Sequence, residues 1–142
     1  MTVPATFRGV DGLQYEIHRE VVAVLIRRAQ QNLSVEYDHL KRACGLRPND
    51  VGWILGSISE WTSKRFHNGG FPIFLSAFVV NKSTRYPGGD FLRLTRIPRP
   101  YRRSRHRNAP LSPKEKAFID KCREKAHAWA SGYEIRMELK KV

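Results

Sequence analysis

The sequence predicts a mainly helical α/β fold, organised as a winged helix-turn-helix with a basic arm and a C-terminal helix. Apolar residues recur at helical spacing in three successive segments, and a turn containing Gly45 separates the last two. The run 73–80 is short, apolar and rich in aromatic and β-branched residues, which is typical of a central strand. The length of 142 residues fits one domain.

The first two helices are predicted from apolar periodicity and capping residues. We expect the first helix at residues 12–32, after an N-terminal arm at residues 1–11. Its buried stripe would consist of residues at every fourth position: Leu13, Ile17, Val21, Leu25 and Ala29. Ser34 predicts the N-cap of a second helix at residues 35–44, which Gly45 would end.

Pro48 suits the first turn of a third helix, expected at residues 48–64. Gly52 and Gly56 lie inside it, where each costs up to about 1 kcal/mol, so we expect a closely approaching backbone or ligand to explain them. Trp53 lies off the buried stripe of this helix. We expect it to pack against the C-terminal helix, and stacking on a nucleic-acid base is the alternative.

The strand and wing of the predicted winged helix-turn-helix follow the third helix, and the whole domain would span residues 12–97. After the strand at 73–80 we expect a polar loop at residues 81–89, which ends in the turn sequence Tyr-Pro-Gly-Gly. A second short strand is expected at residues 91–94.

The composition changes at residues 98–111, which are rich in arginine and proline, contain no acidic residue and predict a basic arm. Ser112-Pro113-Lys114-Glu115 has the pattern of a capping box with proline at the first helical position. It predicts a fourth helix ending near Ala130. Residues 133–139 alternate as an edge strand does. We expect residues 112–142 to pack onto the domain.

The chain is strongly basic. Lys and Arg total 26 against 13 Asp and Glu, so the net charge is +13 and the pI is near 10.4. A domain of this charge is typical of proteins that bind a polyanion, and nucleic acid is the expected partner. An anionic membrane surface and a basic surface with no specific partner are the alternatives. Because no run approaches ~18 apolar residues, we expect no membrane partner.

The patterns of common catalytic and metal sites are missing from the sequence. The five histidines and two cysteines show no metal-ligand spacing, and neither a GxSxG motif nor a P-loop occurs. No basic region followed by an apolar run opens the chain, and Cys44 and Cys122 fit a reducing cytosol. We therefore expect a cytoplasmic protein, nucleoid-associated in a prokaryote, that is not an enzyme and needs no metal or cofactor.

Arginines fall at every third residue in one segment: Arg93, Arg96, Arg99, Arg102 and Arg105. In a polyproline II conformation, which Pro98 and Pro100 favour, this row would face one way at intervals of about 9 Å. Such a row suits contacts with phosphates along or across a groove. The alternative is a disordered basic linker that contacts phosphates without a fixed register.

Motifs in the segment 33–89 follow one another in a recognisable order: Val35-Glu36-Tyr37-Asp38-His39-Leu40, Gly45, Val51-Gly52, Pro72, Val79-Val80 and Gly88-Gly89. In order and spacing this segment resembles the DNA-binding domain of the O6-alkylguanine-DNA alkyltransferases and alkyltransferase-like proteins. The segment 71–82 with Pro87-Gly88-Gly89 also resembles small prokaryotic winged-helix modules that accompany nucleases and defence genes. The resemblance implies DNA binding that serves a repair, nuclease or antiviral system.

Three positions decide what this resemblance implies for activity. Ser76-Ala77-Phe78 stands where the alkyltransferases have Cys, His and Arg, so alkyl transfer is not expected. Asn49 and Asp50 stand where the family's nucleotide-flipping Arg precedes Val-Gly, which argues against base flipping of that kind. Tyr37 matches the family's Tyr that presses on the backbone beside the target nucleotide, and a core or capping role is the alternative.

We therefore expect non-catalytic binding of double-stranded DNA. An RNA-binding ribonucleoprotein subunit and a basic protein-interaction subunit or inhibitor within a larger complex are the alternatives. Tyr37, Arg47, Asn49 and Trp53 would contact the groove, bases or adjoining backbone. Phosphate contacts are expected from basic residues: Lys64, Arg65, Lys82, Arg85, Arg93, Arg96, Arg99, Arg102, Arg103, Arg105 and Arg107.

Overall fold

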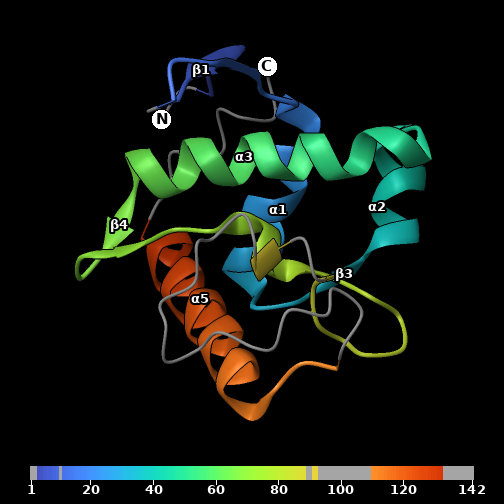
Figure 1. Cartoon of the computed structure of the whole chain (residues 1–142), viewed down its shortest axis with the longest axis vertical. Coiled ribbons are helices and arrows are strands. Elements are labelled where there is room, and N and C mark those ends of the chain that lie inside the picture. Colours follow the sequence, from blue (N-terminus) through green and yellow to red (C-terminus); the bar gives the residue numbers. More distant parts are fainter. Residues whose placement is uncertain (1–2, 10, 89–90, 93–109, 133–142) are drawn as a thin grey trace.

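A computed structural model describes residues 3–9, 11–88, 91–92 and 110–132 of the chain. The fold is α/β and mainly helical, with short strands paired two by two (Figure 1). In the described ranges, none of the helices combines the length and hydrophobicity that crossing a membrane requires. The described residues include the α-helices α1 (Arg19–Gln31), α2 (Tyr37–Cys44), α3 (Val51–Arg65) and α5 (Pro113–Ser131).

A β-hairpin occupies the place where the sequence predicted the first turns of a helix. Strands β1 (Thr6–Arg8) and β2 (Gln14–Glu16) pair antiparallel, and α1 begins only at Arg19. Gly12 adopts φ of 82°, a left-handed conformation that a helix does not contain, and Leu13 is 61% exposed. His18 caps α1 through its ring nitrogen. The prediction of a helix from residue 12 is therefore wrong.

The second helix begins two residues later than the sequence predicts. Strand β3 (Val35–Glu36) pairs in parallel with β6 (Val79–Val80), so Ser34 precedes a strand instead of capping a helix. Glu36 takes the N-cap position of α2 without a side-chain hydrogen bond. Gly45, with φ of 63°, ends α2 as predicted. Helix η1 (Pro48–Asp50), a 3-10 turn, leads into α3.

The predicted central strand at residues 73–80 is a strand only in β6. The residues before it form a 3-10 helix, η2 (Leu75–Phe78), buried in the core. Hydroxyl groups of α3 contact this segment where a neighbouring strand would otherwise lie. Thr62 Oγ1 donates to the carbonyl of Ile73 at 2.8 Å, and the hydroxyls of Ser59 and Ser76 lie 2.5 Å apart. Side chains of α3 therefore make hydrogen bonds to a segment that was predicted to be a β-strand.

The capping box at the start of α5 is confirmed. Ser112 Oγ accepts from the backbone N–H of Glu115 at 3.1 Å, and Glu115 Oε1 accepts from the backbone N–H of Ser112 at 2.8 Å. Pro113 is the first helical residue, and Gly132 follows the last. This terminus was predictable because every interaction that defines it is local in sequence.

Three predicted features lie wholly or largely outside the described residues. They are the second strand at 91–94, the arm at 98–111 and the edge strand at 133–139. The two described residues of the first feature, Phe91 and Leu92, are helical, so a strand there is wrong for those residues.

The core lies around α1, whose buried face packs against α5 and η2. In Figure 1, α3 crosses the molecule with the β1–β2 hairpin on one side and α1 on the other. Helix α2 stands at one end of α3, and β4 (His67–Asn68), paired with β5 (Phe71–Pro72), lies at the other. The faces of α3 that are packed against the core are not available to a ligand.

Candidate nucleic-acid interface

Trp53 faces solvent and does not pack against the C-terminal helix. It is 46% exposed, and its Nε1 donates to Asp50 Oδ1 at 3.0 Å. Phe66 fills the place against α5 that was predicted for Trp53, with its ring centroid 5.0 Å from that of Trp129. The packing prediction is wrong because Phe66, at the end of α3, reaches the C-terminal helix where Trp53, near its start, does not.

The beginning of α3 carries a small polar network. Arg47 Nε donates to Asp50 Oδ2 at 2.8 Å, and hydrogen bonds from Trp53 and Arg47 hold the pKa of the Asp50 carboxyl below its ordinary value. A helix N-terminus favours anions, and here a carboxylate of the chain itself lies beside it. The Arg47 side chain is 83% exposed, and Asn49 is also exposed. Ser57, one helical turn after Trp53, is buried.

The polar loop at residues 81–88 is fastened to β3 and α2 by two residues that were predicted to contact nucleic acid. Tyr37 Oη accepts from the backbone N–H of Gly88 at 3.1 Å. Arg85, with φ of 62°, donates to Glu36 Oε2 at 2.9 Å and to Ser34 Oγ at 3.1 Å. Both Tyr37 and Arg85 therefore position the loop relative to α2.

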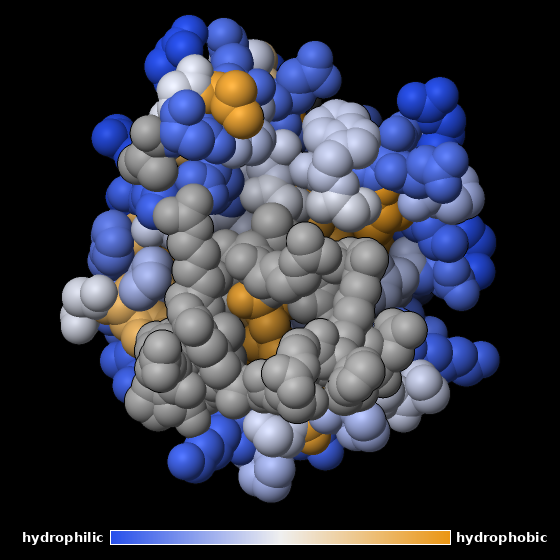
Figure 2. Space-filling model, in the orientation of Figure 1, coloured by the Kyte–Doolittle hydropathy of each residue, from blue (hydrophilic) through white to orange (hydrophobic). Residues whose placement is uncertain are grey.

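These contacts of Tyr37 and Arg85 with the loop place Lys82 near the exposed side of α2. The pKa of the Asp38 carboxyl is lowered first by its hydrogen bond from Lys41, at 2.8 Å, and also by the charges of Arg42 and Lys82. Three cations from two segments thus act on one carboxylate. Figure 2 shows hydrophilic side chains gathered at the right of the view, where Figure 1 places α2. We name this surface, with the adjoining turn, the α2 face: Lys41, Arg42, Arg47, Asn49 and Lys82.

Two of the other predicted phosphate contacts, Lys64 and Arg65, do not join the α2 face. Lys64 and Arg65 are exposed at the far end of α3, a helix about 22 Å long at 1.5 Å per residue. The structure therefore does not bring them together with Lys82 and Arg85. Seven predicted arginines lie outside the described residues: Arg93, Arg96, Arg99, Arg102, Arg103, Arg105 and Arg107.

Sequence reasoning missed Lys41 and Arg42 as interface residues. Leu40 is the buried residue of α2, and Arg42 stands two positions later, about 200° around the helix axis. The exposure of Arg42 was therefore predictable from the helical period. Its proximity to Lys82 was not, because about forty residues of chain separate the two.

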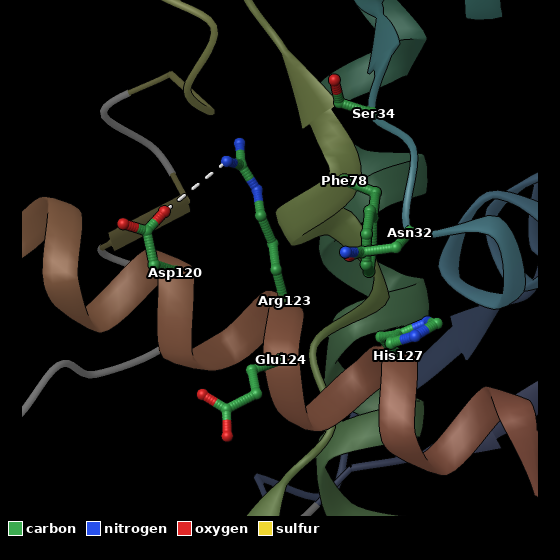
Figure 3. A pocket seen from close by; sticks show the side chains of 7 residues that line it. All are labelled: Asn32, Ser34, Phe78, Asp120, Arg123, Glu124 and His127. Atoms are coloured by element: carbon green, nitrogen blue, oxygen red, sulfur yellow. Dashed lines mark ion pairs between the residues drawn. The ribbon is translucent and has the colours of Figure 1, made fainter.

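A polar pocket of about 390 Å³ lies between α5, η2 and the end of α1 (Figure 3). Phe78 stands in its wall, while Arg123 Nε donates to the carbonyl of Ala77 at 2.9 Å. His127 Nδ1 lies 2.7 Å from the carbonyl of Ala29 and donates to it. In Figure 3 the carboxylate of Glu124 points away from His127. The cationic and imidazole groups of this pocket thus bind backbone carbonyls of the surrounding elements.

The two thiols are not activated. Burial raises the pKa of Cys122 to about 12, and burial with the charge of Glu20 raises the pKa of Cys44. Within the described part of the chain, no group of three or more His, Cys, Asp and Glu side chains could hold a metal ion.

The chain matches no protein-family model, no curated protein and no solved structure.

Proposed function

We propose that this chain is a non-catalytic nucleic-acid-binding module that binds duplex DNA through a winged helix-turn-helix. In this proposal α2 and α3 are the helix pair, and the loop at 81–88 is the wing. The observation that carries the proposal is on the α2 face, where Arg42 of α2 and Lys82 of the loop both act on the Asp38 carboxylate, on a chain of net charge +13. Lysine and arginine contacts with phosphates supply most of the affinity of such interfaces.

The way the loop is held supports this assignment. Because Tyr37 and Arg85 tie the loop to α2 and β3, Lys82 is held within reach of the same carboxylate, that of Asp38, as Arg42 before any ligand binds. A preorganised surface loses less conformational entropy on binding than a loose one. Tyr37 and Arg85 thus support binding by positioning the loop, and Lys82 makes the contact.

Arg47 and Asn49 are the residues of the α2 face suited to groove or base contacts. Asp50 holds the Nε of Arg47, which orients a side chain that is 83% exposed. An oriented guanidinium suits bidentate contacts with guanine or phosphate. The raised pKa values of the thiols and the engaged groups of the polar pocket favour binding without chemistry.

Fluorescence anisotropy tests the proposal with labelled duplex DNA, single-stranded DNA and folded RNA across a salt series. We expect a preference for the duplex and a log–log salt slope of roughly −5 to −8, from ~6–9 phosphate contacts. Replacing Arg42 and Lys82 by Gln is expected to flatten the slope by about 2. Replacing Arg99, Arg102 and Arg105 by Gln is expected to flatten it by about 3.

The matched control replaces Lys114 and Lys121 of α5 by Gln, which removes the same charge from another element. An equal loss of slope in this control would show that net charge, and not the α2 face, carries binding. A preference for RNA at matched salt would assign an RNA-binding subunit instead. Weak binding to all three nucleic acids would refute the proposal and leave a basic protein-interaction subunit.

A further inference from the structure

A groove of about 580 Å³ separates the N-terminal hairpin from the exposed side of α3. This volume lies in the range of sites that take small molecules or a few side chains of a peptide. The groove is lined by residues of β2 and α3: Gln14, Tyr15, Glu16, Gly52, Trp53, Gly56, Ser57 and Glu60.

The two glycines within α3 contribute to the hollow of this groove. A Cβ atom built on Gly52 would meet no described atom within 4 Å. The expectation that another backbone approaches closely at this position is therefore wrong. Gly52 is exposed, and it lines the groove together with Gly56. Glycine is a poor helix former, so its presence at both positions fits a surface kept open for a ligand.

The chemistry of the groove is opposite to that of the chain as a whole. Among the described residues that line it, the charged ones are the acidic Glu16 and Glu60, and none of these lining residues is Lys, Arg or His, in a chain with 26 Lys and Arg. The Glu60 carboxylate reaches toward the hairpin, with Oε1 3.5 Å from the Cβ position of Gly9. A phosphate in this groove would lie among carboxylates, so nucleic acid is disfavoured there.

Trp53 provides an aromatic surface beside these acids. It is 46% exposed, and the hydrogen bond from its Nε1 to Asp50 holds the orientation of the indole. An indole face together with carboxylates is the combination that binds guanidinium and ammonium groups, through cation–π attraction and ion pairing. The ring is therefore oriented before a ligand binds, and the carboxylates beside it have the charge opposite to that of a cationic ligand.

We propose that the groove between β2 and α3 binds an arginine- or lysine-bearing segment of a protein partner. A cationic side chain would lie against the Trp53 indole and pair with Glu60 or Glu16. The open position at Gly52 would admit the backbone of the partner segment. The groove and the α2 face share no residue, and Asp50 links them, because it accepts hydrogen bonds from both Trp53 and Arg47.

The test uses a fluorescein-labelled octapeptide of alternating glycine and arginine, titrated with nucleic-acid-free full-length protein. The matched probe has glutamine in place of arginine. We expect the arginine peptide to bind and the glutamine peptide not to bind, although the net charge of the protein repels the former. Trp53→Ala and Glu60→Gln are each expected to weaken binding at least about five-fold.

Two further variants distinguish binding in the groove from binding by overall charge. Gly52→Leu replaces glycine by a better helix former and fills the groove, so it is expected to abolish peptide binding in a folded protein. Glu124→Gln removes an acidic charge from α5, outside the groove, and is expected to leave binding unchanged. Circular dichroism confirms that each variant is folded, and amide shifts of Gly52 and Gly56 on peptide addition report binding at the groove itself.

Three results would overturn the inference. Equal binding of the arginine and glutamine peptides would show that the groove does not select cations. An equal effect of Glu124→Gln and Glu60→Gln would show that the peptide binds by overall charge. A loss of single-stranded DNA binding in Trp53→Ala, without loss of peptide binding, would make Trp53 a base-stacking residue.

Discussion

Trp53 and Trp61 lie on the same helix in opposite environments. Trp61 is 3% exposed and packs edge-on against Phe66, whereas Trp53 is 46% exposed. We predict that Trp61→Ala lowers the free energy of unfolding by about 3–5 kcal/mol, since it removes a buried ring. Trp53→Ala should lower it by less than about 1 kcal/mol. Urea unfolding followed by circular dichroism measures both, and equal losses would contradict the exposed position of Trp53.

The buried thiol of Cys122 makes the free energy of unfolding decrease at alkaline pH. Its pKa is about 12 in the folded chain against an ordinary value of 9.0, so the folded state keeps a proton that the unfolded state loses. The stabilising contribution is complete below pH 9 and declines as pH rises toward 12. Between pH 8 and pH 10 we predict that the free energy of unfolding falls by about 1 kcal/mol because of this thiol.

The measurement is urea unfolding at several alkaline pH values, compared with Cys122→Ala. This variant loses packing at every pH, but its stability should decline less steeply above pH 9. Tyr86, whose pKa burial and Asp120 also raise, contributes a loss of the same sign in both proteins. Parallel pH profiles for the two proteins would contradict the prediction.

At the scale of elements, α5 depends on its first turn. Ser112 Oγ accepts the backbone N–H of Glu115 at 3.1 Å, which satisfies one of the amide groups at the start of the helix. We predict that Ser112→Ala costs about 1 kcal/mol of unfolding free energy. Ser131→Ala, at the exposed end of the same helix, is the control and should cost less than about 0.5 kcal/mol. A smaller loss for Ser112→Ala than for Ser131→Ala would refute the role of the cap.

The Tyr37 hydroxyl holds the end of the loop at 81–88, while Arg85 holds its middle. Tyr37 Oη accepts the N–H of Gly88 at 3.1 Å. We predict that Tyr37→Phe speeds hydrogen exchange at Gly88 about ten-fold, the equivalent of about 1.4 kcal/mol, and weakens nucleic-acid binding. Amide exchange of Val22 on α1 reports global stability and should change little. Equal acceleration at both amides would show that the hydroxyl supports the whole fold and not the loop alone.

At the scale of the whole molecule, opposite charges occupy separate surfaces. The α2 face is basic, and the groove between β2 and α3 is acidic. We predict a reciprocal pattern in binding assays. Replacing Arg42 and Lys82 by Gln should weaken duplex DNA binding and spare the arginine peptide, whereas Trp53→Ala with Glu60→Gln should do the opposite. Loss of both activities in both double variants would show that the two surfaces are not independent.

Local signals predicted a good part of the fold. The capping box of α5, the glycine end of α2 and the periodicity that buries one side of α1 depend on residues a few positions apart. The hairpin was missed because Leu13 and Ile17 also fit a helical spacing, and Gly12 was not recognised as a turn. The strand at 73–80 was over-extended because an apolar run does not show whether a strand or a helix will lie beside it.

The candidate sites also combine features that follow from the sequence with features that depend on tertiary contacts. The sequence by itself determined the charge of +13 and the local signals that begin α5 and end α2. Only the tertiary structure decided that Lys82 and Arg42 act on the same carboxylate, that Arg85 and Tyr37 hold the loop, and that Trp53 borders a groove whose described charged residues are acidic. The physical reason is the distance along the chain between the residues involved. Net charge is set by composition, and helix capping is set by neighbouring residues. Which side chains share a surface depends on contacts between segments that are distant in the chain.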